Sequence, residues 1–293
     1  MTDFHPLPGT DVVVGGIRLH VTAHGPAPVP GGPLPLLLLH GLPTCSYLWR
    51  DVMRDVGHYR HTVAPDLVGL GRSERPRERE PYRLHLQAER LAGLLDALGI
   101  DRVAVAGHDL GGAVAVHLAA LVPDRVAALI LLDAPIHADS WPVPAVLPLL
   151  VPGGGEAYVT ALRHAPALAR ALLARVLGAG AAHREIEGYL RPLLTADGGR
   201  GLLRFARAVD LAATEAAWRG LAAAPPPTLV LWGERDGLHP ASYGQRVVRG
   251  MPGAVWAPVA DAGHLLPQQR PERVAEELSG FLADAVDGAH LAG

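Results

Sequence analysis

The sequence predicts an α/β fold with a mostly parallel sheet and helices on both of its faces. Short apolar runs alternate with segments of helical periodicity between about residues 34 and 135, and this order is typical of a parallel sheet. Several runs end in turns rich in glycine, proline, histidine or aspartate, as "HGLP" and "GHDLGG" do. With 293 residues, 49% of them hydrophobic, the chain is long enough to bury one large core.

The elements before residue 136 follow this order. A hairpin is expected at the amino end, where Val12–Val14 and Ile17–Ala23 flank the Gly15–Gly16 pair. The segment "LHLQAERLAGLLDALGI", residues 84–100, has apolar residues at helical spacing, which predicts a helix that ends near Gly99. The remaining segments are predicted strands in 34–39, 61–73, 102–107 and 125–135, and a helix over 113–121.

The pattern changes after residue 135. Residues 136–221 show no clear strand and are rich in alanine, leucine, arginine and proline, which indicates a helical insertion. Strands return within 227–236 and 254–264, and a helix beginning at Pro271 closes the chain. We therefore expect a core made of residues 1–135 and 222–293, with residues 136–221 as a cap.

Composition excludes several classes of function. The 26 basic residues are all arginine, and the net charge is −3, so we expect no nucleic-acid partner. The absence of lysine excludes a Schiff base. A single cysteine, Cys45, excludes an internal disulfide and favours a cytoplasmic location. We expect no membrane segment, metal or cofactor, and a small-molecule substrate; the oligomeric state is not predicted.

The segment "VAVAGHDLGGAVAV", residues 103–116, reads as a strand, a tight turn and a helix. Its turn has the G-x-nucleophile-x-G spacing of a nucleophile elbow, with Asp109 where serine is usual. A serine must lose a proton before it attacks a carbonyl. An aspartate is already ionised at neutral pH and can attack a saturated carbon directly. The pattern therefore favours a covalent ester with the substrate over ordinary acyl transfer.

Four stretches in order resemble the α/β-hydrolases, specifically the Asp-nucleophile branch with the epoxide hydrolases and haloalkane dehalogenases. They are "HGLPTCSYLWR" (40–50), "PDLVGLGRS" (65–73), "GHDLGG" (107–112), and "WGERD" (232–236) followed by "GH" (263–264). The resemblance implies an α/β-hydrolase fold with an inserted helical cap. It also implies a two-step reaction, in which a histidine activates water to hydrolyse the ester.

The resemblance implies a role for six residues outside the cap. Asp109 is the expected nucleophile, and His264 in "DAGH" is the expected base. Asp236 is the favoured acid that orients the histidine, and Asp133 at the end of "LILLDAP" is the alternative acid. The backbone N–H groups of Leu42 and Leu110 are the expected oxyanion hole.

The leaving group is the open question. Dehalogenases of this family resemble one another in holding the halide with side-chain N–H donors where this chain has Leu42 and Leu110. Trp141 and Trp218 in the cap are possible substitutes. Epoxide hydrolases use two cap tyrosines. Tyr158 falls where the first is expected, and Phe205 where the second is expected, with Tyr189 as a stand-in.

We rank epoxide hydrolysis first and haloalkane dehalogenation second. An esterase or lactonase, a non-hydrolytic tailoring enzyme using the same pocket, and a ligand-binding receptor with a hydrolase-like fold remain further alternatives. The presence of an aspartate at the elbow argues against the esterase, and the Asp109–His264–Asp236 set argues against the receptor.

Overall fold

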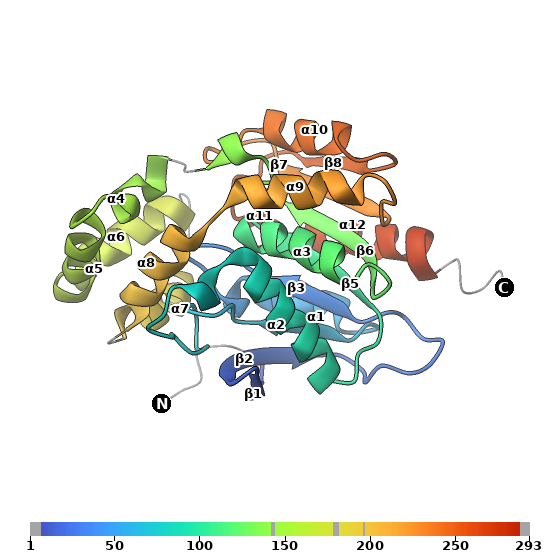
Figure 1. Cartoon of the computed structure of the whole chain (residues 1–293), viewed down its shortest axis with the longest axis horizontal. Helices are drawn as coiled ribbons and strands as arrows, with labels where there is room; N and C mark the ends of the chain where they lie inside the picture. The colour runs from blue at the N-terminus through green and yellow to red at the C-terminus, as the bar shows by residue number, and fades with distance from the viewer. Residues whose placement is uncertain (1–6, 142–143, 178–181, 196, 288–293) are drawn as a thin grey trace.

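An eight-stranded sheet forms the centre of the molecule in the computed structural model, which describes residues 7–141, 144–177, 182–195 and 197–287. The strand order is β1-β2-β4-β3-β5-β6-β7-β8; the first two strands are antiparallel to their neighbours and the rest are parallel (Figure 1). The strands are β1 Gly9–Val14, β2 Ile17–His24, β3 Leu36–Leu39, β4 Thr62–Pro65, β5 Val103–His108, β6 Val126–Leu132, β7 Thr228–Gly233 and β8 Val255–Val259. The predicted α/β-hydrolase fold class is confirmed.

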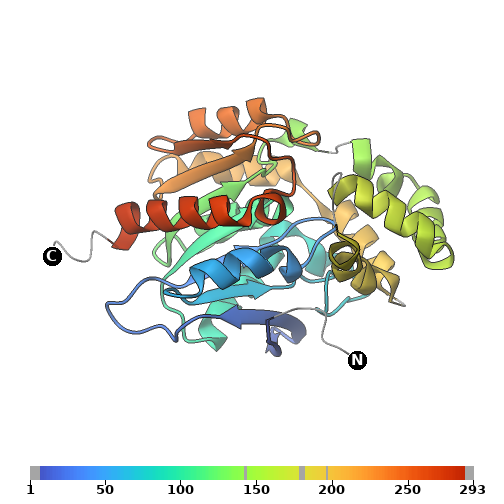
Figure 2. The same ribbon diagram turned by 180° about the vertical axis from the view of Figure 1, so that it is seen from behind.

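Helices cover both faces of the sheet. On one face α2 (Leu84–Ala97) packs against α3 (Leu110–Leu121), and α3 packs against α9 (Leu211–Leu221). On the other face α1 (Arg50–Val56) packs against α12 (Pro271–Leu282), as Figure 2 shows. The helix α10 (Ala241–Arg249) connects β7 to β8, and the short helix α11 (Leu266–Gln269) lies between β8 and α12.

The buried strands explain why two hydrophobic clusters form. Successive side chains of a strand point to opposite faces. In β3, Leu37 and Leu39 accordingly join the cluster under α2 and α3, whereas Leu36 and Leu38 join the cluster under α1 and α12. A strand with apolar residues at every position is therefore buried on both faces, which is the situation of a central parallel strand.

The segment between β6 and β7 is helical, as its composition predicts. Its helices are α4 Leu147–Leu150, α5 Gly154–His164, α6 Pro166–Leu177, α7 His183–Leu194, α8 Gly198–Ala208 and α9. Helices α4 to α8 form one group at the end of the sheet in both ribbon views, whereas α9 lies along α3 (Figures 1 and 2). The boundaries proposed for the cap, 136–221, stay a prediction, and α9 is the part of that range that covers the sheet.

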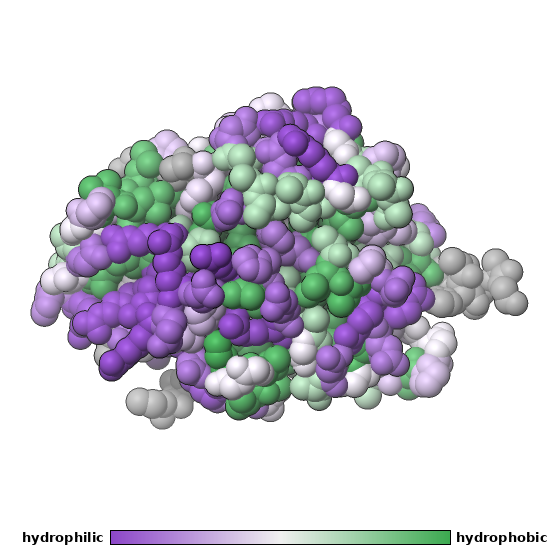
Figure 3. All heavy atoms as spheres, viewed as in Figure 1, coloured by the Kyte–Doolittle hydropathy of each residue, from purple (hydrophilic) through white to green (hydrophobic). Residues whose placement is uncertain are grey.

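A cavity on the outer surface lies away from the candidate catalytic residues. This cavity of about 430 Å³ lies between α2, α3 and the start of α9, and many of its lining side chains are charged or histidines. Hydrophilic side chains also gather over α7 and α8 on this side of the molecule (Figure 3). Among the described residues, no helix combines the length and the apolar character that crossing a membrane would need.

Candidate active site

Asp109 occupies a strained turn between β5 and α3. Its φ of 51° lies in the left-handed region, which costs free energy for a residue with a side chain. The turn is possible because the residues two positions before and two positions after Asp109 are glycines: a Cβ on Gly107 would lie 2.4 Å from the Gly111 carbonyl oxygen, and a Cβ on Gly111 would lie 2.4 Å from that of Leu39. The helix follows at once, at Leu110 rather than at the expected Ala113.

The carboxylate of Asp109 is buried and held from the loop after β3. The backbone N–H of Leu42 donates to Asp109 Oδ2 at 2.9 Å. Gly41 allows this approach, because a Cβ there would lie 2.2 Å from the same oxygen. The N–H of Leu42, an expected oxyanion donor, thus already faces the nucleophile. Leu110, the other expected donor, begins α3 directly after Asp109.

His264 and Asp236 meet at the ends of the loops that follow β8 and β7. Nδ1 of His264 lies 2.9 Å from Asp236 Oδ2, and its Nε2 lies 3.9 Å from Asp109 Oδ1. The other oxygen of Asp236 accepts from the backbone N–H groups of Leu238 and His239, at 2.7 and 2.9 Å. Asp236 is therefore fixed by three donors and points one oxygen at the imidazole.

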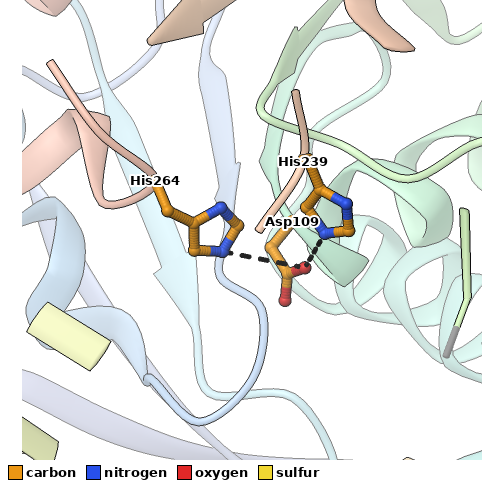
Figure 4. Close-up of side chains that lie close together, drawn as sticks. All are labelled: Asp109, His239 and His264. Carbon is orange, nitrogen blue, oxygen red and sulfur yellow. Dashed lines mark ion pairs between the residues drawn. The ribbon is translucent and has the colours of Figure 1, made fainter. Parts of the chain in front are cut away.

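A second histidine, His239, also faces the nucleophile. Its Nε2 lies 3.4 Å from Asp109 Oδ1, closer than that of His264, and the two imidazole rings are 5.3 Å apart (Figure 4). Sequence reasoning missed this residue. The available signal was its position three residues after Asp236, because that loop ends at the same edge of the sheet as the elbow.

Asp109, Asp236 and His264 shift one another's pKa values. Burial on its own would raise the pKa of Asp109, but the contact with His239 and the charge of His264 lower it to about 2. Burial on its own would lower the pKa of His264, but the hydrogen bond and charge of Asp236, together with Asp109, raise it to about 9. Asp109 is therefore ionised at neutral pH, and His264 is protonated beside it.

Asp133, the alternative acid, is buried near this cluster but makes different contacts. Its Oδ1 accepts from the backbone N–H of Gly233 at 2.8 Å, and its Oδ2 has no hydrogen-bond partner among the described residues. Burial, and then the charge of Asp236, raise the pKa of Asp133 well above its usual range. The structure brings Asp236, and not Asp133, within hydrogen-bond distance of His264.

The cap residues differ in their relation to the nucleophile. Tyr158 of α5 lines a small cavity of about 40 Å³ together with Pro43, which follows Leu42; the other lining residues are Leu162, Ala169, Leu173, Leu190, Leu193 and Leu202. The hydroxyl of Tyr158 has no hydrogen-bond partner among the described residues, and burial raises its pKa. This cavity joins the cap to the loop that holds Asp109.

The other three cap residues are less suited to donate a proton there. The hydroxyl of Tyr189 donates to Gln268 Oε1 at 2.6 Å, and its ring packs edge-on against Tyr47. Phe205 is fully buried in the hydrophobic core. Trp141 is half-buried and packs against the same core at the start of the cap.

Comparison with known proteins agrees with this arrangement. A family model described as the alpha/beta hydrolase fold matches residues 35–168. An epoxide hydrolase from Caballeronia sordidicola is 30% identical, with 94% of each chain covered. A haloalkane dehalogenase from Bradyrhizobium diazoefficiens is 26% identical over 85% of this chain and 86% of its own. The crystal structure of the haloalkane dehalogenase DbeA from Bradyrhizobium elkani, 25% identical, matches with a TM-score of 0.78 over 95% of this chain and 98% of its own.

The chain belongs to the α/β-hydrolase family. The protein is an α/β-fold hydrolase whose relatives include both epoxide hydrolases and haloalkane dehalogenases.

Proposed function

We propose that this protein hydrolyses epoxides of small, largely apolar molecules through a covalent ester on Asp109. The observation that carries the proposal is Tyr158, a phenol in an otherwise apolar cavity that adjoins the loop holding the nucleophile. The same neighbourhood has leucine at positions 42 and 110, and leucine offers no side-chain N–H to a departing halide. A pocket with a proton donor and no side-chain halide donors favours an epoxide.

In the first step, Asp109 Oδ1 attacks a ring carbon and the carbon–oxygen bond of the epoxide breaks. The carboxylate is suited to this attack because its pKa is about 2 and because Leu42 holds its other oxygen. The epoxide oxygen takes the electron pair of the broken bond and needs a proton. Tyr158 supplies that proton by general-acid catalysis, which contributes about 10²-fold or more in comparable enzymes.

In the second step, water hydrolyses the ester at Cγ of Asp109. Formation of the ester removes the negative charge of Asp109, which is one of the charges that raise the pKa of His264. The pKa of His264 therefore falls when the ester forms, and the imidazole becomes able to take a proton from water. Asp236 holds the ring and stabilises the charged imidazole that results. The Leu42 N–H stabilises the oxyanion, and the diol leaves with the former Oδ1 of Asp109.

The test is a comparison of matched epoxides and bromoalkanes at equal concentrations. We expect diol formation from a terminal or styrene-type epoxide and weaker or no release of bromide. The variant Tyr158→Phe should lower the epoxide rate by about 10²-fold. Tyr189→Phe is the matched control, because it also removes a cap hydroxyl, but one bonded to Gln268.

Dehalogenation is the second candidate, favoured by the dehalogenase relative and the matched structure described above. Strong bromide release with inert epoxides would reverse the ranking. It would direct attention to Trp141, whose indole N–H would then be the first halide donor to test by Trp141→Phe.

A further inference from the structure

The nucleophile and two histidines, all three buried, direct their possible metal-ligand atoms at one point. Asp109, His239 and His264 each offer one metal-ligand atom, and among the described residues these atoms lie within 4.8 Å of one another. Figure 4 shows both imidazoles pointing at the same carboxylate oxygen. His264 is the residue proposed to act on water, whereas His239 enters the proposed reaction only through its contact with Asp109, which lowers the pKa of that carboxylate.

The spacing of these atoms suits a transition-metal ion. Oδ1 of Asp109 lies 3.4 Å from His239 Nε2 and 3.9 Å from His264 Nε2. The third distance, between the ligand nitrogens of His239 and His264, is at most 4.8 Å. The point equidistant from the three atoms is therefore about 2.4 Å or less from each. Zinc binds imidazole nitrogen and carboxylate oxygen at about 2.0–2.2 Å, so shifts of a few tenths of an ångström complete three bonds.

The surroundings also suit a metal. Metal-bound histidines commonly donate their second ring nitrogen to a carboxylate, and Nδ1 of His264 already lies 2.9 Å from Asp236. Two imidazoles and one carboxylate favour Zn²⁺ and Co²⁺ over Mg²⁺ and Ca²⁺, which prefer oxygen ligands. We propose that Asp109, His239 and His264 form a binding site for a divalent metal ion of the zinc class.

Such a site would inhibit the hydrolase. The metal would occupy Oδ1 of Asp109, the oxygen proposed to attack the substrate, and Nε2 of His264, the atom proposed to activate water. Metal binding itself does not depend on the identity of the substrate, because it uses only residues of the free protein.

The experiment is a titration of the chelator-treated full-length protein with cobalt chloride, followed by visible absorption. Long incubation is needed because all three residues are buried. We expect one Co²⁺ per chain with a spectrum of low coordination number, displaced by Zn²⁺ and not by Mg²⁺. His239→Leu should weaken binding by about 100-fold or more, and Asp236→Asn by about 10–100-fold.

His58→Gln is the control for metal held by surface histidines, because His58 is exposed and remote in sequence from the cluster. Its affinity should equal that of the wild type. Circular dichroism checks the fold of His239→Leu; if that variant does not fold, His239→Phe replaces it. Failure of the wild type to bind Co²⁺, or equal affinity in a folded variant at position 239, would overturn the site. Neither result bears on epoxide hydrolysis, which is measured separately in metal-free buffer.

Discussion

Replacing Asp133 by asparagine should stabilise the protein relative to the wild type, and increasingly so as the pH rises. Asp133 is fully buried, and only its Oδ1 has a donor, the N–H of Gly233. Burial and the nearby charge of Asp236 raise the pKa of Asp133 well above its usual range, so the native protein keeps this proton to a higher pH than the unfolded chain does. Asparagine is close to the same shape and keeps the acceptor for Gly233.

The direction of this pH dependence follows from the number of protons that the native and the unfolded states bind. In the unfolded chain an aspartate loses its proton near pH 4, whereas native Asp133 keeps its proton to higher pH. Between these two pKa values the native state binds one more proton than the unfolded state. The free energy of unfolding therefore falls by about 1.4 kcal/mol for each pH unit in that window. Asparagine does not titrate, so the variant lacks this loss.

Urea unfolding at pH 5, 6 and 7 measures the effect. The free energy of unfolding of Asp133→Asn minus that of the wild type should increase with pH, by about 1.4 kcal/mol for each unit of pH that lies between the unfolded and the native pKa of Asp133. Asp101→Asn, which removes an exposed carboxylate, provides the baseline. A difference that does not change with pH would show that Asp133 has no raised pKa in the native state and would refute the reasoning.

Three further outcomes are expected at the site. Asp109→Asn should abolish turnover while circular dichroism stays native-like, because the amide is nearly isosteric but cannot act as the nucleophile; wild-type activity would end the covalent hypothesis. His264→Gln should form the ester and fail to hydrolyse it, so intact-protein mass spectrometry should detect an adduct that maps to position 109. Asp236→Asn should lower the hydrolysis rate far more than Asp133→Asn, because Asp236 contacts His264; the opposite order would move the acid role to Asp133.

The fold was predictable because its signals are local. Strand β3 has leucine at every position, and such a run is explained by burial on both faces of a parallel sheet. The glycines around Asp109 identify the elbow, because a side chain at either position would collide with backbone. The helical character of the insertion was also readable, since it depends on composition and periodicity within single segments.

The sequence by itself therefore determined the α/β class, the elbow and the residue that occupies it. Only the tertiary structure decided which side chains meet Asp109 and His264, because contacts between the ends of different strands depend on strand order and loop path rather than on neighbours in the chain. Two acids follow adjacent strands, yet only Asp236 reaches the imidazole, while Asp133 is turned to Gly233. His239 belongs to no motif, and the structure identifies it as a partner of Asp109 because the loop after β7 places its Nε2 3.4 Å from Asp109 Oδ1.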